Sequence, residues 1–315
     1  MPPQPHIREA PGRAVRAARR ETDAVLVTGA ASTAVRRVLD GPRRDARVLA
    51  AFRLACYLEL SGPAEPRVLA LITARAVRLP NALVLPDGTP LYGLQPGAYG
   101  QVGAGVVAAG PVLAGAARWW DPVPVLSPVT PEALDHRVAH LDAVRTASER
   151  RPGLTPSDGP GPLTTACATD ALADAVEQSE RIVGLGPGLT PSGDDFLCGL
   201  LLALRLLTPC VSPAVPAGGA AVRLADWIGA AVTSDATTRT TALSATLLHC
   251  AAAGQASGEA AGVLRALTCP GGQGLTVATR RLLATGHTSG ADLAWGLAAG
   301  ARAVTSLARL EGRAA

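Results

Sequence analysis

The sequence contains no lysine, so its 29 formally cationic Lys and Arg side chains are all arginines. This absence excludes a Schiff-base lysine, a lysine general base and the lysine of a phosphate-binding P-loop. Aromatic residues make up only 3% of the chain, and the net charge is +4. Because a nucleic-acid groove needs a basic surface and aromatic side chains that stack on bases, we expect no nucleic-acid binding.

Paired cysteines and long apolar runs are also missing. The six cysteines include no C-x-x-C pair, so neither a zinc site nor a disulfide framework is expected. The most hydrophobic segment is bounded by Asp195 and Arg205, which leaves it shorter than the ~18 residues of a membrane span. Residues 1–20 are rich in arginine and have no apolar segment behind them, which predicts a flexible tail and a cytoplasmic protein without membrane contact.

The composition predicts a folded chain of two domains. Hydrophobic residues make up 48% and charged residues 17% of the 315 positions, which is enough to bury a sizeable core. From about 47 to 126, short apolar stretches alternate with Gly and Pro, a texture typical of short strands and turns. We therefore predict a mainly β domain at 21–126, built as a small sheet or a barrel-like structure.

The remainder of the sequence has helical patterning. Thr130 is placed to cap a helix that begins at Pro131, and apolar residues then recur at three- and four-residue spacing. Further helices are predicted at roughly 163–183, 192–207, 217–233, 239–253, 258–268, 275–285 and 290–310. The predicted fold class is therefore α+β, with an all-α domain at 127–315 after the mainly β domain.

One motif occurs twice in the helical region. The segment "GLTPSGDDFLCG" (188–199) aligns with "GHTSGADLAWG" (286–296) when Pro191 is skipped, and each copy leads into an apolar helix. We interpret the shared pattern, G-x-T-(x)-S-G-x-D-x-x-x-G, as an internal pseudo-repeat of a glycine loop and a helix N-terminus. A shorter echo, "PGLTPS" at 152–157, we interpret as coincidental, because the "PGP" that soon follows it should not continue as a helix.

Helix capping explains part of this repeated motif. Ser192 and Asp195 have the S-x-x-D spacing of a capping arrangement, as do Ser289 and Asp292 in the second copy. The glycines of the motif have no role in capping, and Gly inside a helix costs about 0.5–1 kcal/mol relative to Ala. Close approach of the other copy or of a ligand explains them better, both at the first helical position (Gly193, Gly290) and one turn later (Gly199, Gly296).

Two helix starts that face each other would form a polar site of bare N–H groups, hydroxyls and carboxylates. Asp194 is the leading catalytic candidate, because capping does not require it and the second copy has Ala291 there. Asp194 and Asp195 are also the candidate ligands of a divalent cation such as Mg²⁺, which would bridge them to a phosphate or an acidic substrate. Arg239 is the other candidate partner for such an anion, although its segment also fits a threonine-rich capped loop.

The predicted site extends beyond the acidic pair. His287 is a candidate base beside the second copy, or else a solvated loop histidine. The predicted catalytic residues are Asp194 and Asp195, and the predicted substrate-binding residues are Gly186, Gly188, Thr190, Ser192, Gly193, Arg239, Thr240, His287, Thr288, Ser289, Gly290, Asp292 and Asn81.

Three segments together, "GxGPGLTPSGDDFLxG", "TTRTTALSATLLHCAAAG" and "GHTSGADLAWG", give the sequence a family resemblance. The chain resembles the AllH-type subunit of oxamate carbamoyltransferase, a family once described only as a prokaryotic domain of unknown function. The likeness extends upstream through "VLAAFRLACYLEL" and "LPNALVL", where Asn81 is the only Asn of the chain. The assignment of Asp194, Asp195, Thr190, Ser192 and Gly193 to the site comes from local physical reasoning and not from this resemblance.

The resemblance implies one subunit of a three-part enzyme of purine-ring (allantoin) catabolism. Such an enzyme exchanges a carbamoyl group between oxalurate and phosphate, with oxamate and carbamoyl phosphate as the products. It also implies protein partners, including a larger subunit similar to acyl-CoA synthetases. Two alternatives remain open from the sequence: a non-catalytic scaffold that docks partners, and a stand-alone lyase or hydrolase that acts on a small carboxylate.

Overall fold

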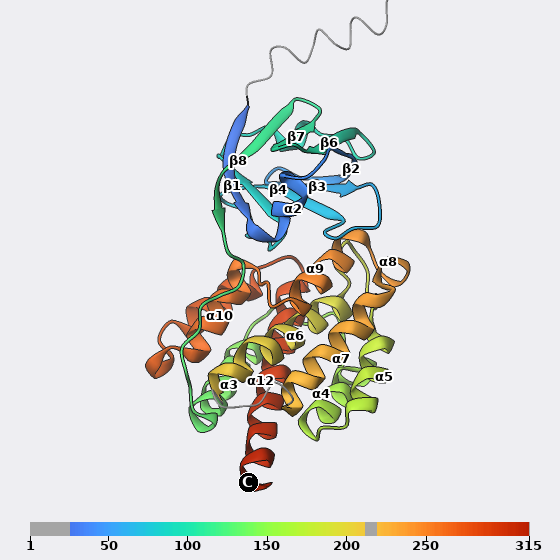
Figure 1. Ribbon diagram of the computed structural model, residues 1–315. Coiled ribbons are helices and arrows are strands. Elements are labelled where there is room, and N and C mark those ends of the chain that lie inside the picture. The colour runs from blue at the N-terminus through green and yellow to red at the C-terminus, as the bar shows by residue number, and fades with distance from the viewer. Residues whose placement is uncertain (1–25, 212–218, 315) are drawn as a thin grey trace, which may run out of the picture.

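The computed structural model describes residues 26–211 and 219–314. The predicted flexible tail at 1–20 lies outside these residues. Figure 1 shows two structural parts, with a β-barrel at one end of a larger group of helices. The predicted α+β class, a barrel-like β region followed by a helical region, is confirmed.

The barrel is closed by eight strands in the order β1-β5-β4-β3-β2-β6-β7-β8. Two neighbouring pairs, β1 with β8 and β4 with β5, are parallel, and the other pairs are antiparallel. A short helix, α2 (Arg36–Leu39), follows the first strand. The strands are β1 (Val27–Ser32), β2 (Arg44–Ala51), β3 (Ala55–Leu60), β4 (Val68–Thr73), β5 (Ala82–Leu85), β6 (Tyr99–Gly103), β7 (Val106–Ala109) and β8 (Val112–Trp120).

Strand β4 shows why one side of the barrel faces the helices. All six of its residues are buried, which is the pattern of a strand covered on both faces. Leu69 and Leu71 belong to the core inside the barrel. Ala70 and Ile72 belong to a separate small cluster on the other face. The outer face of β4 is therefore apolar and lies against another part of the molecule.

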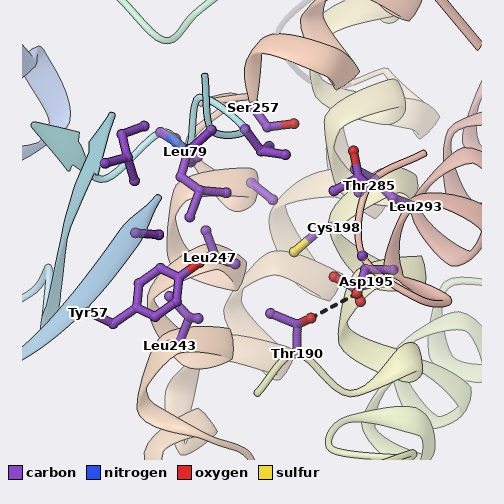
Figure 2. Close-up of a pocket in the computed structure, with 18 of the residues that line it drawn as sticks. Tyr57, Leu79, Thr190, Asp195, Cys198, Leu243, Leu247, Ser257, Thr285 and Leu293 are labelled. Carbon is purple, nitrogen blue, oxygen red and sulfur yellow. Dashed lines mark hydrogen bonds between the residues drawn. The ribbon is translucent and has the colours of Figure 1, made fainter. Parts of the chain in front are cut away.

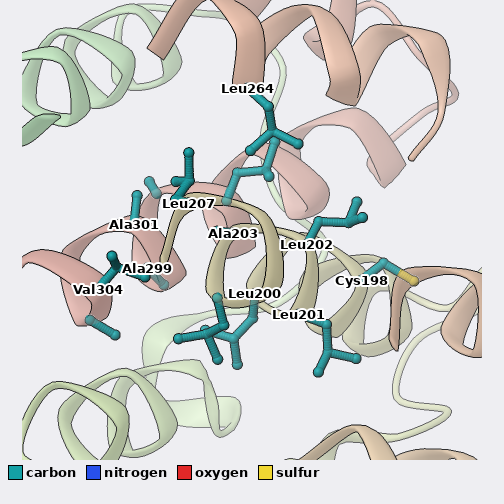
Figure 3. Packing of buried hydrophobic residues seen from close by; sticks show 14 of the residues in the cluster. Cys198, Leu200, Leu201, Leu202, Ala203, Leu207, Leu264, Ala299, Ala301 and Val304 are labelled. Carbon is teal, nitrogen blue, oxygen red and sulfur yellow. The ribbon is translucent and has the colours of Figure 1, made fainter. Parts of the chain in front are cut away.

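The helical part is built around two long helices, α6 and α12, which pack along each other (Figure 1). Figure 3 shows leucines of α6 interleaved with small residues of α12, among them Ala299 and Ala301. The helices are α3 (Pro131–Thr146), α4 (Pro160–Ala168), α5 (Leu172–Ile182), α6 (Ser192–Val211), α7 (Ala220–Ser234), α8 (Ala236–Arg239), α9 (Ala242–Ala252), α10 (Gly258–Thr268), α11 (Leu275–Leu283) and α12 (Ser289–Ala314).

Several local predictions can be compared with these helices. The cap at Thr130 is confirmed, because its side chain accepts a hydrogen bond from the Ala133 N–H at 3.2 Å. The single helix predicted at 163–183 is wrong: the structure has α4 and α5, separated at Asp170, whose φ is 55°. The "PGP" segment also begins α4, because Pro160 occupies a first-turn position that tolerates proline. None of the described helices combines the length and the hydrophobicity needed to cross a lipid bilayer.

The glycines at the crossing of α6 and α12 have the role that close packing predicts. A Cβ atom on Gly199 would lie 2.2 Å from the carbonyl oxygen of Leu293, and one on Gly296 would lie 2.0 Å from that of Phe196. Each glycine therefore lies directly against the backbone of the other helix. This contact fixes the two helices at a short distance, with their N-terminal ends side by side.

Candidate functional site

The two glycines nearest the helix starts fit against their own chain segments. The sequence predicted both glycines at the first helical position, but each is the second residue of its helix. A Cβ atom on Gly193 would lie 1.9 Å from the carbonyl oxygen of Ile182 at the end of α5. A Cβ atom on Gly290 would lie 2.0 Å from that of Leu282 at the end of α11. Neither glycine needs a ligand to explain it, because the preceding helix end already occupies the space.

The hydroxyl groups of the two copies pair across the helix starts. Thr190 Oγ1 and Ser289 Oγ are 2.9 Å apart, and Ser192 Oγ and Thr288 Oγ1 are 3.2 Å apart. Thr190 and Thr288 hold the same place in the motif, as do Ser192 and Ser289. The two hydrogen bonds are therefore equivalent, and each joins the Thr of one copy to the Ser of the other.

The carboxylates also reach across, in place of the capping arrangement that the spacing predicted. Asp195 lies beside the hydroxyl of Ser289, and Asp292 lies beside that of Ser192. The backbone N–H of Asp195 donates to the carbonyl oxygen of Pro191. Each Asp, with a Thr of its own copy and the Ser of the other, forms what we call a corner: the Asp195 corner (Asp195, Thr190, Ser289) and the Asp292 corner (Asp292, Thr288, Ser192).

The Asp292 corner is closed by the chain itself. The backbone N–H of Gly153 donates to both carboxylate oxygens of Asp292, at 3.0 and 3.1 Å, and the N–H of Leu154 adds another hydrogen bond. A Cβ atom on Gly153 would lie 2.1 Å from Ser192 Oγ. The "PGLTPS" segment at 152–157 therefore contacts the repeated motif that it resembles: it begins at this corner and covers Asp292, which is completely buried.

Asp194, the leading catalytic candidate from the sequence, has both carboxylate oxygens engaged. One accepts a hydrogen bond from the Gly184 N–H at 2.8 Å, and the other accepts one from the Thr240 hydroxyl. Burial raises the pKa of Asp194, while these hydrogen bonds and one from Ser244 act in the opposite direction. Asp194 thus ties the loop before α6 to the segment between α8 and α9, and it does not line the cavity described below.

The acidic pair shows no geometry for a metal ion. Asp195 faces the cavity described below, whereas Asp194 is bound to backbone and hydroxyl groups elsewhere. In the described part of the chain, no group of three or more His, Cys, Asp or Glu side chains is placed to hold a metal ion. The Mg²⁺ site at Asp194 and Asp195 therefore stays a sequence-based prediction without a supporting contact.

A cavity of about 460 Å³ lies between the barrel and the helices. Its barrel side comes from β3, from β4 and from the segment that follows β4, and its helical side comes from α6, α9 and α12. Figure 2 shows Tyr57, Leu243 and Leu247 on one side and Thr190, Asp195 and Cys198 on the other. Most of the wall is apolar, and the Asp195 corner supplies its one acidic group among the described lining residues.

Asp195 is the buried acidic group of this cavity. Its side chain belongs to a residue that is only 8% exposed, and within the described residues its Oδ2 atom has no hydrogen-bond partner. Burial raises the pKa of Asp195 to about 8, and the neighbouring carboxylates of Asp292 and Asp194 add to this, against hydrogen bonds from Ser289 and Thr190. At pH 7 the group is therefore mostly a neutral carboxylic acid that exchanges its proton readily.

Of the residues predicted from the sequence, three line the cavity: Thr190, Asp195 and Ser289. Ser192, Thr288 and Asp292 form the closed corner, and Gly290 and Gly193 pack on helix ends. Gly186 packs against Ser192, and Gly188 is exposed.

The remaining predicted residues lie away from the cavity. Arg239 donates to the carbonyl oxygen of Glu180 and pairs with Asp235, so it does not supply an anion site in the cavity. Asn81 is buried in the barrel wall, where its Nδ2 donates to the carbonyl oxygen of Val68 at 2.9 Å. Thr240 contacts Asp194, as described above. His287 lines a separate open depression beside Arg150 and Arg151.

The sequence did not predict six polar residues of the cavity wall: Tyr57, Arg75, Cys198, Gln255, Ser257 and Thr285. Cys198 follows Asp195 by three positions, so helical spacing alone placed its thiol on the same face. Tyr57 points its hydroxyl into the cavity (Figure 2), and burial raises its pKa. Arg75 is exposed and lines the cavity rim. Tyr57 and Arg75 belong to the barrel side, and only the docking of barrel on helices brings them to the site.

Comparison with protein families supports the resemblance seen in the sequence. A family model described as oxamate carbamoyltransferase subunit AllH matches residues 182–301. The matched segment runs from the end of α5 into α12, so it includes both corners and α9 but not the barrel. No solved structure matches the chain.

Proposed function

We propose that the chain is a subunit of a carbamoyl-transferring enzyme of the oxamate carbamoyltransferase type. In this proposal the cavity at Asp195 holds the compound that gives or accepts the carbamoyl group. The matched family segment supports it, because that segment contains Thr190, Asp195 and Ser289. The reaction is the exchange of a carbamoyl group between a ureido compound such as oxalurate and phosphate. It takes place in the cytoplasm, in purine-ring (allantoin) catabolism, within a complex that includes a subunit similar to acyl-CoA synthetases.

One observation carries this proposal: Asp195 lines the cavity as a carboxyl group that is nine-tenths buried, and within the described residues its buried Oδ2 atom has no hydrogen-bond partner. Carbamoyl transfer needs a group that gives a proton to the departing nitrogen or takes one from the attacking nitrogen. A carboxyl group whose pKa is about 8 serves both directions near neutral pH. The hydroxyls of Thr190 and Ser289 donate hydrogen bonds to this carboxyl group and hold it in place beside the cavity.

The proposed step in the direction of carbamoyl phosphate has the following balance. A phosphate oxygen attacks the ureido carbonyl carbon and forms a C–O bond, and the bond from that carbon to the amide nitrogen of oxamate breaks. The nitrogen keeps the electron pair and takes the proton of Asp195, which becomes a carboxylate. In reverse, this carboxylate takes the proton from the attacking nitrogen. Arg75 is the one cationic side chain among the lining residues described, so we assign the phosphate to the rim.

A non-catalytic scaffold is the second candidate, because packing alone accounts for four glycines of the repeat. In that case the chain would dock the subunits that perform the chemistry. Calorimetric titration of the isolated chain with oxalurate, oxamate or carbamoyl phosphate would then show no saturable heat of binding.

The test is the phosphorolysis of oxalurate by the complex assembled with its partner subunits. Asp195→Asn keeps the size of the side chain but cannot exchange the proton, so we expect turnover to fall about 100-fold or more. The matched control is Asp87→Asn, in the exposed loop after β5, which should keep full activity. Wild-type turnover by the Asp195→Asn complex would overturn the assignment, and would favour the scaffold if the isolated chain also binds none of the three compounds.

A further inference from the structure

The two corners have the same construction but different surroundings. Each joins an Asp at the fourth helical position to the Thr–Ser hydroxyl pair, with O–O distances of 2.9 Å in the Asp195 corner and 3.2 Å in the Asp292 corner. The structure therefore contains a filled corner and an open one. The group that fills the first is a guide to what fits the second.

Peptide groups fill the Asp292 corner. The N–H of Gly153 donates to both oxygens of Asp292, and the N–H of Leu154 donates as well. These donors are neutral amides, and they enter without any cation. A buried carboxyl group in this setting is thus satisfied by amide N–H groups together with the Ser192 and Thr288 hydroxyls, without a cation.

The Asp195 corner lacks these donors. Within the described residues, no backbone N–H donates to the side chain of Asp195, which lines the cavity, and its buried Oδ2 atom has no partner. An unpaired polar atom at such a buried position is costly, so a ligand that supplies the missing donor gains more than its own hydrogen bond. Because Asp195 is mostly protonated at pH 7, a complementary ligand needs an N–H donor for a carboxyl oxygen and a carbonyl acceptor for the proton of the acid, and an amide group provides both.

The remainder of the cavity calls for an apolar body. Beyond the corner, the wall is formed by side chains such as Tyr57, Leu79, Leu243, Leu247 and Leu293. Oxamate has six non-hydrogen atoms. If each atom occupied about 30 Å³, which is the volume of one molecule in liquid water, oxamate would fill less than half of the cavity. The cavity measures about 460 Å³. A compound of the size of oxamate would leave most of the leucine wall uncovered.

We propose that the cavity binds an uncharged carboxamide or ureide that carries an apolar substituent of several carbons. Its N–H groups donate to Asp195 as the peptide groups of Gly153 and Leu154 donate to Asp292, and its substituent lies along the leucines of α9. This inference rests on the proposed function only for the identity of the head group as a carbamoyl-type group. It names a larger substrate class than oxamate or oxalurate.

The experiment is calorimetric titration of the full chain at pH 7 with methylurea and butylurea, which share one head. Each methylene that enters an apolar wall raises affinity about fourfold, so butylurea should bind roughly 50-fold more tightly than methylurea. Butylamine and pentanoate carry the same butyl group on a charged head, and each should bind at least tenfold more weakly than butylurea. Oxamate should bind more weakly than butylurea.

Two pairs of variants test the contacts. Asp195→Asn retains a carbonyl acceptor and should bind butylurea with little change, whereas Asp195→Leu should lose binding while its circular dichroism stays that of a folded chain. Leu247→Ser should weaken butylurea but not methylurea. Val277→Ser, at a position of α11 that is 55% exposed, is the matched control and should change neither.

Equal affinity for methylurea and butylurea, binding of oxamate more tightly than butylurea, or binding of butylamine or pentanoate as tightly as butylurea would overturn this inference. The absence of binding by every probe would also overturn it. These outcomes leave the turnover of the Asp195→Asn complex untouched, so the proposed function is judged separately. Conversely, if the chain binds butylurea but the complex with Asp195→Asn keeps normal turnover, the inference about the ligand stands and the proposed function is wrong.

Discussion

Asp195 illustrates how one buried residue affects stability and chemistry in opposite directions. Burial makes its ionised form costly, and the same burial brings its proton exchange close to neutral pH. Asp194, the adjacent residue, is also buried but has partners on both oxygens. The two residues therefore contribute differently to the molecule, although they are neighbours in the chain.

The first prediction concerns stability against pH. The pKa of Asp195 rises from an ordinary 3.8 to about 8 in the folded chain, so the folded state holds this proton while the unfolded state releases it. The free energy of unfolding should therefore fall as pH rises from about 4 to 8, by an amount on the order of 5 kcal/mol from this group. Urea unfolding at pH 5, 6.5 and 8 measures it.

Asp195→Asn is the variant that isolates this effect. Since Asn does not ionise, the variant should be more stable than wild type at pH 8 and should have a flatter pH profile. Asp87→Asn should follow the wild-type curve. An unchanged slope in Asp195→Asn would show that Asp195 titrates normally.

The sequence identified the residues of the Asp195 corner, but it favoured Asp194 as the leading catalytic candidate, and Asp194 does not line the cavity. Repetition of the motif pointed to Thr190, Asp195 and Ser289, which do line it. Adjacent residues on a helix point about 100° apart, so only one acid of the pair can face a given cavity. Whether Asp194 or Asp195 faces the cavity depends on how α6 is rotated about its axis in the fold, and local residue spacing does not determine that rotation.

At the scale of elements, the crossing of α6 and α12 sets the geometry of the corners. Gly199 and Gly296 place the helix backbones in direct contact, and the hydroxyl pairs form because the helix starts are held together. Periodicity and the repeat predicted these helices and their close approach. The break between α4 and α5 was not predicted, because no proline or glycine marks it: the residue with positive φ there is Asp170.

The second prediction tests that crossing. Gly296→Ala places a Cβ atom 2.0 Å from a backbone oxygen of α6, so the helices must separate. We expect a loss of about 1–3 kcal/mol in the free energy of unfolding, together with weaker ligand binding at the Asp195 corner. The measurement is urea unfolding of both proteins. Gly262→Ala is the control on α10, where the nearest atom is 3.9 Å away, and it should be neutral or slightly stabilising.

At the scale of the whole molecule, the barrel and the helices are joined by a few polar contacts around the cavity. The Val68 N–H of β4 donates to Thr246 Oγ1 of α9 at 3.2 Å. The N–H groups of Ala256 and Gly258 donate to the carbonyl oxygens of Pro122 and Arg78. Composition predicted both parts, but nothing in their separate patterns indicated which barrel wall would meet which helix. The barrel side of the cavity was for that reason not predictable.

The third prediction tests this junction. Thr246→Val preserves the shape of the side chain but leaves the Val68 N–H, which is completely buried, without an acceptor. Stranding such a donor costs about 1–3 kcal/mol in the free energy of unfolding. Thr165→Val is the control, because the exposed Thr165 hydroxyl bonds only within its own helix, to Gly161, and the change there should be within about 0.5 kcal/mol. Equal effects of the two substitutions on chemical denaturation would argue against the junction contact.

The cavity lies between the barrel and the helices, so each part determines a different aspect of which compound it binds. The Asp195 corner belongs to two helices that cross with no room for a Cβ atom at Gly199 or Gly296, so its position is fixed by the fold. The opposite wall comes from β3, β4 and the segment after β4, where Arg75 and Ala76 are not fully buried. Substitutions at 52–80 should therefore change which apolar substituent the cavity accepts, while the Asp195 corner that binds the head group stays the same.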